Sequence, residues 1–303
     1  MEKVLEKIPS NLIQKIEKQY GKEILEEVLI GFTKKKKVSL RVNPLKASRE
    51  EVLKVFEEKN IVYKSVSWYE DAFVIENVQE KDIEELDVYK DGKIYLQNLS
   101  SMLPPILLNP EEKIDILDMT AAPGGKTTEM AALTNNNAYI TACEMNKIRA
   151  DRLRFNLKMQ DAKAVVIEKD ARNLDDFLKF DKILLDAPCS GSGTIYVSED
   201  SKEVLYTENF ANKLENTQTK LLEKAIKLLK KNEEMVYSTC SILERENENI
   251  VNKFIEKGLV EVVKDYDNKF DDIKKLPCKI DGAICVMPNE NYEGFFMIKL
   301  RKK

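Results

Sequence analysis

The sequence of 303 residues contains no histidine. This absence excludes hydrolases with a Ser-His-Asp triad, Cys-His proteases and His-Glu-x-x-His metalloenzymes, because imidazole supplies the base or the metal ligands in each of them. A general base in this protein must therefore be a carboxylate, a thiolate, a lysine amine or a water molecule.

Cysteine is also scarce: the five residues are an odd number and include no Cys-x-x-Cys pair. Neither a disulfide framework nor a zinc site is favoured, and the spacing of Cys278 and Cys285 is only a weak metal signal, so we expect no bound metal. No apolar run is long enough to span a bilayer, and the charged N-terminus is unlike a signal peptide. We expect a cytoplasmic protein that does not bind membranes, and we take it to be a monomer.

The chain has no excess of basic residues, since 49 Lys and Arg are balanced by 53 Asp and Glu, for a net charge of −4. Without a global positive field, a nucleic acid would have to be bound by a local patch. The best candidate is the run Lys34–Lys37 with Arg41 just after it. Charge runs are usually solvated faces, so this run alone is weak evidence for contact with phosphate.

The N-terminal part has the pattern of a small α/β unit, which we expect to cover residues 1–95. Its predicted elements are a helix over 10–29 and strands over 38–42, near 62–63 and over 72–75. Ser48 followed by Glu51 has the capping-box pattern and predicts a helix through Lys59. The segment 94–105 is interpreted as a linker into a larger domain over 96–303.

Strands and helices alternate regularly in the larger domain. Strands are expected over 114–118, 139–144, 164–167, 183–186, 235–238 and 295–300, and helices over 127–133, 148–159, 211–230 and 246–254. Strands that alternate with helices of this length predict an α/β fold with a doubly wound, mostly parallel sheet covered on both faces.

The segment Asp118-Met-Thr-Ala-Ala-Pro-Gly-Gly-Lys-Thr-Thr128 lies between the first strand and the first helix of this sheet. A glycine pair alone would indicate an ordinary tight turn. However, Glu144 closes the second strand nineteen residues after Gly125 (144 − 125), a separation typical of an acid that binds ribose hydroxyls. Asp170 and Asp186 follow the third and fourth strands. Since the carboxyl ends of parallel strands face one crevice, these acids predict a nucleoside cofactor there.

A P-loop-like nucleotide-binding protein is the alternative, because Gly124-Gly-Lys-Thr127 resembles the end of that motif and 183–186 resembles a magnesium-binding strand. The P-loop requires a glycine five positions before Gly125, but Thr120 occupies that position. A nucleotide hydrolase would also leave Glu144 and the cysteines unexplained.

Two cysteines fifty-one positions apart (240 − 189) each follow a predicted strand. Cys189 and Cys240 are therefore expected in the same crevice, where two thiols indicate covalent chemistry on an electrophilic carbon. A buried structural cysteine is the more common case. Hydroxyl groups at the flanking positions argue for a reactive Cys240, and we expect them to stabilise its thiolate, together with Lys126 or a cationic cofactor. The hydroxyl residues are Ser238, Thr239 and Ser241.

These motifs resemble the Sun/Rsm (NSUN-type) S-adenosylmethionine-dependent RNA cytosine-C5 methyltransferases over nearly the whole chain. The matching segments are Leu40-Arg-Val-Asn43, Gln97-Asn-Leu-Ser-Ser-Met-Leu-Pro104, Ala121-Ala-Pro-Gly-Gly-Lys-Thr127, Asp186-Ala-Pro-Cys-Ser-Gly-Ser-Gly193, Tyr237-Ser-Thr-Cys-Ser241, Glu246-Asn-Glu248 and Gly294-Phe-Phe296. The resemblance implies a class I, Rossmann-like methyltransferase domain after an N-terminal unit similar to an RNA-recognition fold. It implies that S-adenosylmethionine is bound by Ala121, Ala122, Pro123, Gly124, Gly125, Lys126, Thr127, Glu144, Asp170 and Asp186.

The same resemblance assigns the catalytic residues. Cys240 is the nucleophile that attacks C6 of the cytosine, Cys189 helps to release the product, and Asp186 is placed near the N3/N4 edge of the base. DNA cytosine methyltransferases carry their nucleophile in the Pro-Cys motif, so Cys189 as the attacking thiol remains an alternative. We expect ribosomal RNA as the first candidate substrate and transfer RNA as the next.

Two features differ from many relatives. Thr120 occupies a position where many have cysteine, and many bacterial ribosomal-RNA enzymes carry an additional C-terminal RNA-binding domain, whereas this chain stops at Lys303. A different class of protein, a catalytically silent RNA-binding or ribosome-assembly factor on the same scaffold, would be expected to have lost the site residues. Both cysteines and the acids at the strand ends are present.

Overall fold

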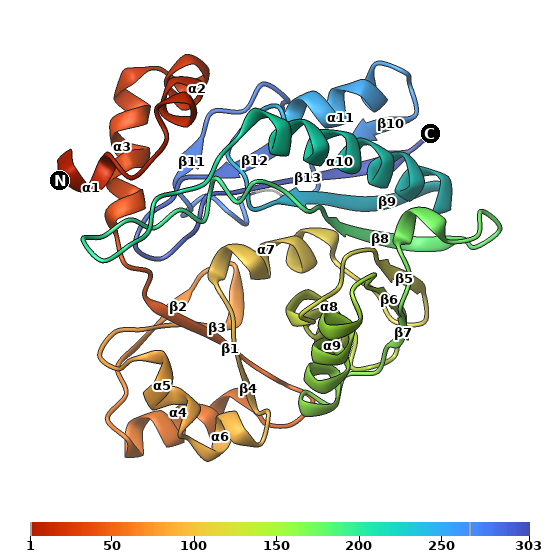
Figure 1. Cartoon of the computed structure of the whole chain (residues 1–303). Coiled ribbons are helices and arrows are strands. Elements are labelled where there is room, and N and C mark those ends of the chain that lie inside the picture. The colour runs from red at the N-terminus through yellow and green to blue at the C-terminus, as the bar shows by residue number, and fades with distance from the viewer. Residues whose placement is uncertain (1, 267) are drawn as a thin grey trace.

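A computed structural model describes residues 2–266 and 268–303, and within them the strands form a four-stranded sheet and a nine-stranded sheet (Figure 1). The smaller sheet is antiparallel, in the order β2-β3-β1-β4. Its strands are β1 (Val38–Val42), β2 (Tyr63–Val66), β3 (Tyr69–Ile75) and β4 (Ile94–Leu96). It is accompanied by the helices α4 (Arg49–Glu58), α5 (Glu80–Glu84) and α6 (Asp87–Lys90). The predicted capping box at Ser48 and Glu51 is confirmed.

The helix predicted over 10–29 is wrong as a single element. After the short α1 (Glu2–Leu5), the chain forms α2 (Ser10–Tyr20) and α3 (Lys22–Thr33), which are separated by Gly21 with φ of 83°. Glycine tolerates this left-handed conformation, so the chain turns there. Both helices pack against the core of the larger unit, which contains Tyr237 and Phe296. The domain boundaries 1–95 and 96–303 remain a prediction. The helices α2 and α3, although N-terminal, contribute side chains to the core of the larger unit.

The linker predicted over 94–105 is also wrong. Its first residues form β4, the edge strand of the small sheet, and Asn98 then caps helix α7 (Leu99–Leu108). Pro104 and Pro105 lie inside this helix, where proline normally removes a hydrogen bond and ends the helix. Here the helix is almost entirely buried between the two sheets, so packing outweighs the local preference.

The larger sheet has the order β11-β12-β13-β9-β8-β5-β6-β7. Its five central strands are parallel: β5 (Asp115–Asp118), β6 (Tyr139–Cys143), β7 (Val165–Ile167), β8 (Phe180–Asp186) and β9 (Leu229–Thr239). The last strand, β13 (Phe295–Lys302), runs antiparallel between β9 and β12 (Ala283–Val286). The short strands β10 (Val260–Val262) and β11 (Lys275–Leu276) complete the sheet, and the sequence predicted neither of them nor β12.

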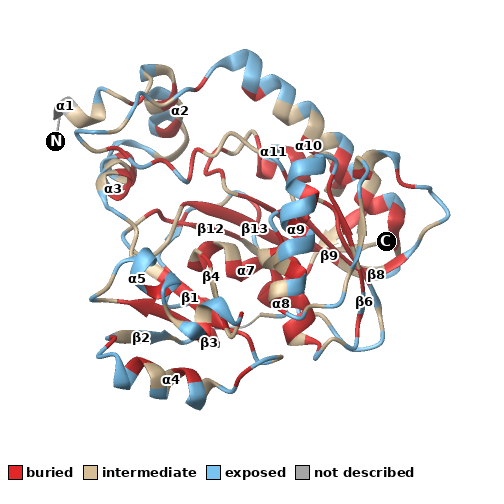
Figure 2. Ribbon diagram, turned by 60° about the horizontal axis from the view of Figure 1, so that its bottom comes forward, coloured by how far each residue is buried: buried red, intermediate tan, exposed pale blue. Residues whose placement is uncertain are grey.

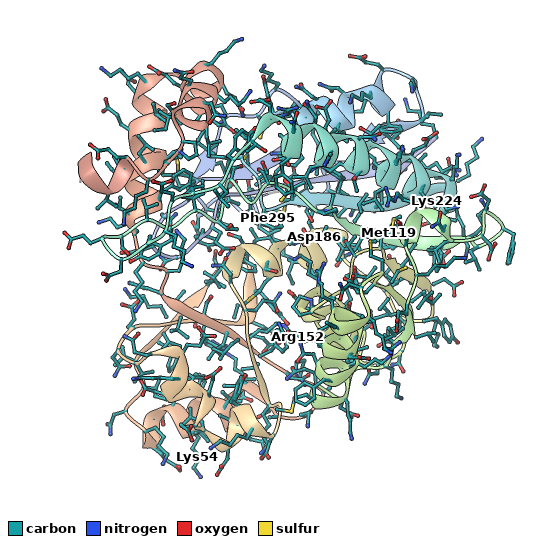
Figure 3. All side chains as sticks on the ribbon, in the orientation of Figure 1. Lys54, Met119, Arg152, Asp186, Lys224 and Phe295 are labelled. Atoms are coloured by element: carbon teal, nitrogen blue, oxygen red, sulfur yellow. The ribbon has the colours of Figure 1, made fainter. Side chains whose placement is uncertain are left out.

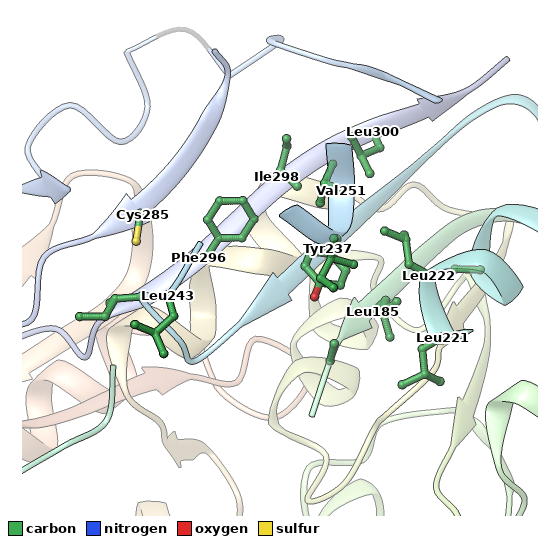
Figure 4. Close-up of a cluster of buried hydrophobic side chains, with 14 of the residues drawn as sticks. Leu185, Leu221, Leu222, Tyr237, Leu243, Val251, Cys285, Phe296, Ile298 and Leu300 are labelled. Atoms are coloured by element: carbon green, nitrogen blue, oxygen red, sulfur yellow. The ribbon is translucent and has the colours of Figure 1, made fainter. Parts of the chain in front are cut away.

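Helices cover both faces of this sheet, as predicted. One face carries α7, α8 (Gly125–Leu133) and α9 (Lys147–Met159), and the other carries α10 (Glu208–Leu228) and α11 (Glu248–Ile255) (Figure 1). The central strands are buried on both sides (Figure 2). Figure 4 shows part of the core under α10 and α11, where Leu185, Leu221, Tyr237 and Phe296 pack together. The predicted α/β fold with a mostly parallel sheet is confirmed.

Candidate active site

Two cavities meet at the carboxyl ends of the central strands, where ligands bind in open parallel sheets. They have volumes of about 250 Å³ and about 290 Å³, and Thr120, Ala122 and Asp186 line both of them. We call the smaller one the acid cavity and the larger one the lysine cavity. In Figure 3, Asp186 lies beside Met119 and Phe295 in the middle of the molecule.

The acid cavity contains the predicted nucleoside-binding carboxylates at strand ends, Glu144, Asp170 and Asp186. Glu144 is buried, accepts a hydrogen bond from the backbone N–H of Asn146 (2.9 Å) and lies 3.5 Å from the guanidinium of Arg149. Asp170 accepts hydrogen bonds from the side chain of Arg172, and this contact lowers the pKa of Asp170 below its usual value. Glu144 and Asp170 are therefore held in place by neighbouring residues.

The glycine-rich loop connects β5 to α8, and its residues differ in their access to the two cavities. Ala121, Ala122, Pro123, Gly125 and Lys126 line a cavity. Gly124 and Thr127 are buried behind the loop and line neither cavity. Thr127 donates a hydrogen bond to Asp118 (2.6 Å), whose pKa burial raises to about 6. The carbonyl oxygen of Gly124 accepts a hydrogen bond from the hydroxyl of Thr128 (2.8 Å), so Gly124 and Thr127 stabilise the loop and line neither cavity themselves.

Lys126 points into the lysine cavity, where its amine forms an ion pair with Asp186 (2.7 Å) and donates to the hydroxyl of Ser101 (2.8 Å). The amine also lies 5.7 Å from the ring centre of Phe295. Burial lowers the pKa of Lys126, but Asp186 more than compensates, so the net shift is upward and the amine is a cation at neutral pH. The ion pair with Asp186 thus fixes a positive charge next to the junction of the two cavities.

The two predicted cysteines are brought together, as their strand ends suggested. The sulfur atoms of Cys189 and Cys240 are 3.1 Å apart, both thiols are free, and both side chains line the acid cavity. The hydrogen bond with Cys240 and burial raise the pKa of Cys189 well above its usual value. In its protonated form Cys189 can donate a hydrogen bond to the sulfur of Cys240.

The predicted role of the hydroxyl groups around Cys240 is wrong. Ser238 donates to Asp186 (2.8 Å), Thr239 to Asn247 (2.6 Å) and Ser241 to Glu246 (2.6 Å). A hydroxyl has one proton to donate, so none of the three stabilises a thiolate. The neighbouring cation, Lys126, interacts electrostatically with Cys240 and is the remaining candidate for stabilising its thiolate.

Glu246 is the residue whose place in the site the sequence did not reveal. Its side chain is fully buried and accepts four hydrogen bonds. Two come from Ser190, beside Cys189, one from Ser241, beside Cys240, and one from Gln218 on α10. The carboxylate therefore ties together the loops that carry the two thiols. The segment Glu246-Asn-Glu248 was the only sequence signal, and it indicated no role.

The run Lys34–Lys37 lies outside both cavities. Lys36 donates to the carbonyl oxygen of Asn289 (2.6 Å), and Lys37 forms an ion pair with Glu76 (3.1 Å). Lys35 donates to the side chain of Gln79 (3.1 Å), so three of the four amines already have partners within the chain, and contact between this run and RNA remains a prediction.

The fold is that of the Rossmann-like, class I methyltransferases. Comparable folds are found in the crystal structure of PH0851 (TM-score 0.88, 30% identity, 99% of this chain and 68% of that one) and in that of a methyltransferase homolog protein from Pyrococcus horikoshii (TM-score 0.80, 28% identity, 97% and 100%). The chain belongs to the family described as 16S rRNA methyltransferase RsmB/F, whose model matches residues 105–301. A second model, the ferredoxin-like domain of RsmF/B-like methyltransferases, matches residues 8–81. The resemblance to the Sun/Rsm family is thereby confirmed.

Curated relatives are longer than this chain. The ribosomal RNA small subunit methyltransferase F of Shewanella piezotolerans is 33% identical over 96% of this chain and 63% of its own length. That of Shewanella denitrificans is 32% identical over 97% of this chain and 60% of its own length. The chain thus spans about three-fifths of these relatives.

No described helix has the length and apolar character needed to cross a bilayer. Nor do the described residues include a group of three His, Cys, Asp or Glu side chains arranged to hold a metal ion.

Proposed function

We propose that this protein transfers a methyl group from S-adenosylmethionine to C5 of a cytosine in RNA, through a covalent bond between Cys240 and C6 of the base. The observation that carries the proposal is the contact of two free thiols, 3.1 Å apart, beside the Lys126–Asp186 ion pair. Thiol chemistry on a pyrimidine requires a thiolate, a nearby cation and a second group that moves a proton. The thiols line the acid cavity, Lys126 lines the lysine cavity beside it, and Asp186 borders both.

The acid cavity suits the nucleoside part of S-adenosylmethionine. Glu144 and Asp170 provide carboxylate oxygens with free lone pairs for ribose and base donors, and the exposed side chain of Met145 provides an apolar surface. When bound, S-adenosylmethionine supplies the methyl group. The residues of the cavity bind and orient it, and they place the reaction next to Cys240.

The lysine cavity suits the target base. C5 of cytosine is a poor nucleophile, and addition of the Cys240 thiolate to C6 converts the ring into an enamine that reacts at C5. Charge then develops at the N3/N4 edge of the ring. Lys126 can donate a hydrogen bond to that edge and Asp186 can accept one from it, and this stabilises the adduct.

Release of the product requires a base. After methylation, the C5–H bond breaks, its proton moves to the base, the C5–C6 double bond re-forms and the bond between C6 and the Cys240 sulfur breaks. Cys189 is the candidate base, directly or through a water molecule, because its sulfur lies beside that of Cys240. Cys189 must first lose its own proton to a water molecule; the features that raise its pKa then make the resulting thiolate a strong proton acceptor.

Ribosomal RNA is the favoured substrate and transfer RNA the next candidate. The family description and the relatives with 32–33% identity both concern ribosomal RNA of the small subunit. Because the base must leave its stack to reach a thiol, a single-stranded or loop region is the expected target.

Trapping of the adduct tests the proposal. RNA that contains 5-fluorocytosine has no C5 proton to lose, so the protein should remain covalently bound to it through Cys240 when S-adenosylmethionine is present. Cys240→Ala should form no adduct, whereas Cys189→Ala should accumulate an adduct even with unmodified RNA. An adduct formed by Cys240→Ala would assign the attack to Cys189 instead. Absence of S-adenosylmethionine binding in calorimetry would refute the enzymatic proposal.

A further inference from the structure

The outer face of α9 exposes residues that a helix covering a sheet normally does not expose. Ile148 and Phe155 are 79% and 63% exposed, and Arg152 lies between them in the sequence. Much of α9 is coloured as exposed in Figure 2. Spacings of four and three residues place these side chains along one face of the helix. The opposite face buries Leu153 and Leu157 against the glycine-rich loop and the sheet. The helix thus leaves a face of apolar and cationic residues without a partner within the described chain.

A groove lies between this helix and the small sheet, with a volume of about 600 Å³. It is lined by Lys46, Lys90, Asp91, Lys93, Phe155, Lys158 and Met159. Four lysines and one aspartate give it a strongly positive character, although the whole chain carries a net charge of −4. A local basic groove with an exposed aromatic ring is the pattern expected for single-stranded nucleic acid.

Lys46 of the groove donates to the carbonyl oxygen of Met159 (3.1 Å), but the other cations on this side of the molecule have fewer partners than the run Lys34–Lys37. Among the residues that the structure describes, none forms an ion pair with Lys93, Arg152 or Lys158. Lys90 pairs with Glu85 at the surface, where such contacts are weak. The cations without an ion pair therefore lie on α9, with Arg152 and Lys158, and directly before β4, with Lys93.

The groove continues toward the lysine cavity. Arg152 is close enough to Tyr95 to interact electrostatically with its hydroxyl, which also accepts a hydrogen bond from Asn156 (3.4 Å). Tyr95 in turn lines the lysine cavity together with Lys126. In Figure 3, Arg152 lies on the side of α9 that is toward the small sheet. A strand of RNA in the groove would thus be directed to the base pocket.

We propose that this groove holds a single-stranded segment of the substrate RNA next to the target cytosine, with phosphates on Lys93, Arg152 and Lys158 and one base stacked on Phe155. The inference rests on the proposed function, since it adds a place for the RNA. Charge favours RNA over a protein partner. The groove has four lysines and only one carboxylate among its lining residues, and Arg152 adds a further positive charge beside it.

The test uses the full chain and a fluorescent single-stranded RNA of about 20 nucleotides, a length that covers several contacts of this kind. Lys93→Gln/Lys158→Gln should weaken binding about tenfold and reduce the slope of log Kd against log salt by about 1.4, since each lost phosphate contact on a single strand contributes about 0.7. Phe155→Ala should weaken binding at least about fivefold with an unchanged slope, and Phe155→Tyr should restore it, because stacking depends on the ring.

The matched control is Lys213→Gln/Lys220→Gln, which removes two exposed lysines from α10 on the other face of the sheet and should leave RNA binding unchanged. Binding of S-adenosylmethionine should be unaffected in every variant. Wild-type RNA affinity in both groove variants would overturn the inference and leave a protein as the partner of this face, with the proposed function intact. Failure of the wild-type chain to bind RNA and S-adenosylmethionine would instead overturn the proposed function, and the inference with it.

Discussion

Replacing Glu246 by alanine should separate the two loops that carry the thiols. The change leaves the donors of Ser190, Gln218 and Ser241 without their buried acceptor. Each hydrogen bond to a charged group contributes about 1.5–3 kcal/mol, and the serine hydroxyls can turn to other acceptors, so a net loss of about 3–5 kcal/mol of unfolding free energy is expected. A displacement of the thiols by about 1 Å would reduce the rate of methyl transfer about 100-fold.

Glu246→Gln separates the geometry from the charge. One carboxylate oxygen of Glu246 accepts from the Ser190 N–H and from Gln218, and the other accepts from the two serine hydroxyls. A glutamine carbonyl can replace the first oxygen, and its NH₂ group can donate to the hydroxyls, which also act as acceptors. This variant should lose only about 1–2 kcal/mol and should keep most of the activity that alanine abolishes.

The assay combines thermal unfolding, calorimetry with S-adenosylmethionine and single-turnover methylation below the unfolding range of each variant. Glu248→Gln is the matched control. Glu248 is also buried and lies two positions further along the chain, but its side chain makes no hydrogen bond to the loops that carry the cysteines. We expect Glu246→Ala to bind S-adenosylmethionine within twofold of the wild-type affinity. A single-turnover rate for folded Glu246→Ala within threefold of wild type would refute the positioning role.

Three further predictions concern other parts of the molecule. Burial raises the pKa of Glu129 to about 8, so the folded protein keeps a proton that the unfolded chain releases near the ordinary pKa of glutamate. The resulting contribution to the free energy of unfolding is present at acid pH and is lost as the pH rises to about 8. Glu129→Gln should remove that decline. If the free energy of unfolding, measured by denaturant at each pH from 5 to 9, changed in the same way in both proteins, the assignment would be wrong. Gly193→Ala would bring a Cβ to 1.9 Å from the carbonyl oxygen of Gly294, so a loss of about 3 kcal/mol is expected in denaturant unfolding, and an unchanged midpoint would show that the loops separate easily. Lys126→Met should reduce single-turnover methylation about 100-fold with RNA affinity changed less than fivefold, and a normal rate would exclude the amine from the chemistry.

Local patterns were good guides to the fold wherever they agreed with packing. The capping box at Ser48 and the alternating strands and helices of the larger unit are present as predicted. The errors occurred where burial outweighed local preference, as in α7, which continues through Pro104 and Pro105 between the two sheets. The short strands β10 and β11 pair with β13 and β12, which provide edges for them.

The acids and thiols at strand ends were recognisable in the sequence by themselves, because a parallel sheet delivers the ends of its strands to one edge. Cys189 and Cys240 could be assigned to one crevice on that ground, and the absence of histidine limited the chemistry to thiols, carboxylates and lysine. Tertiary structure alone decided how these groups are connected. Hydrogen-bond partners depend on side chains from distant segments, so only the folded chain shows that Glu246 joins the two cysteine loops, with the sulfur atoms 3.1 Å apart, and that the neighbouring hydroxyls donate elsewhere.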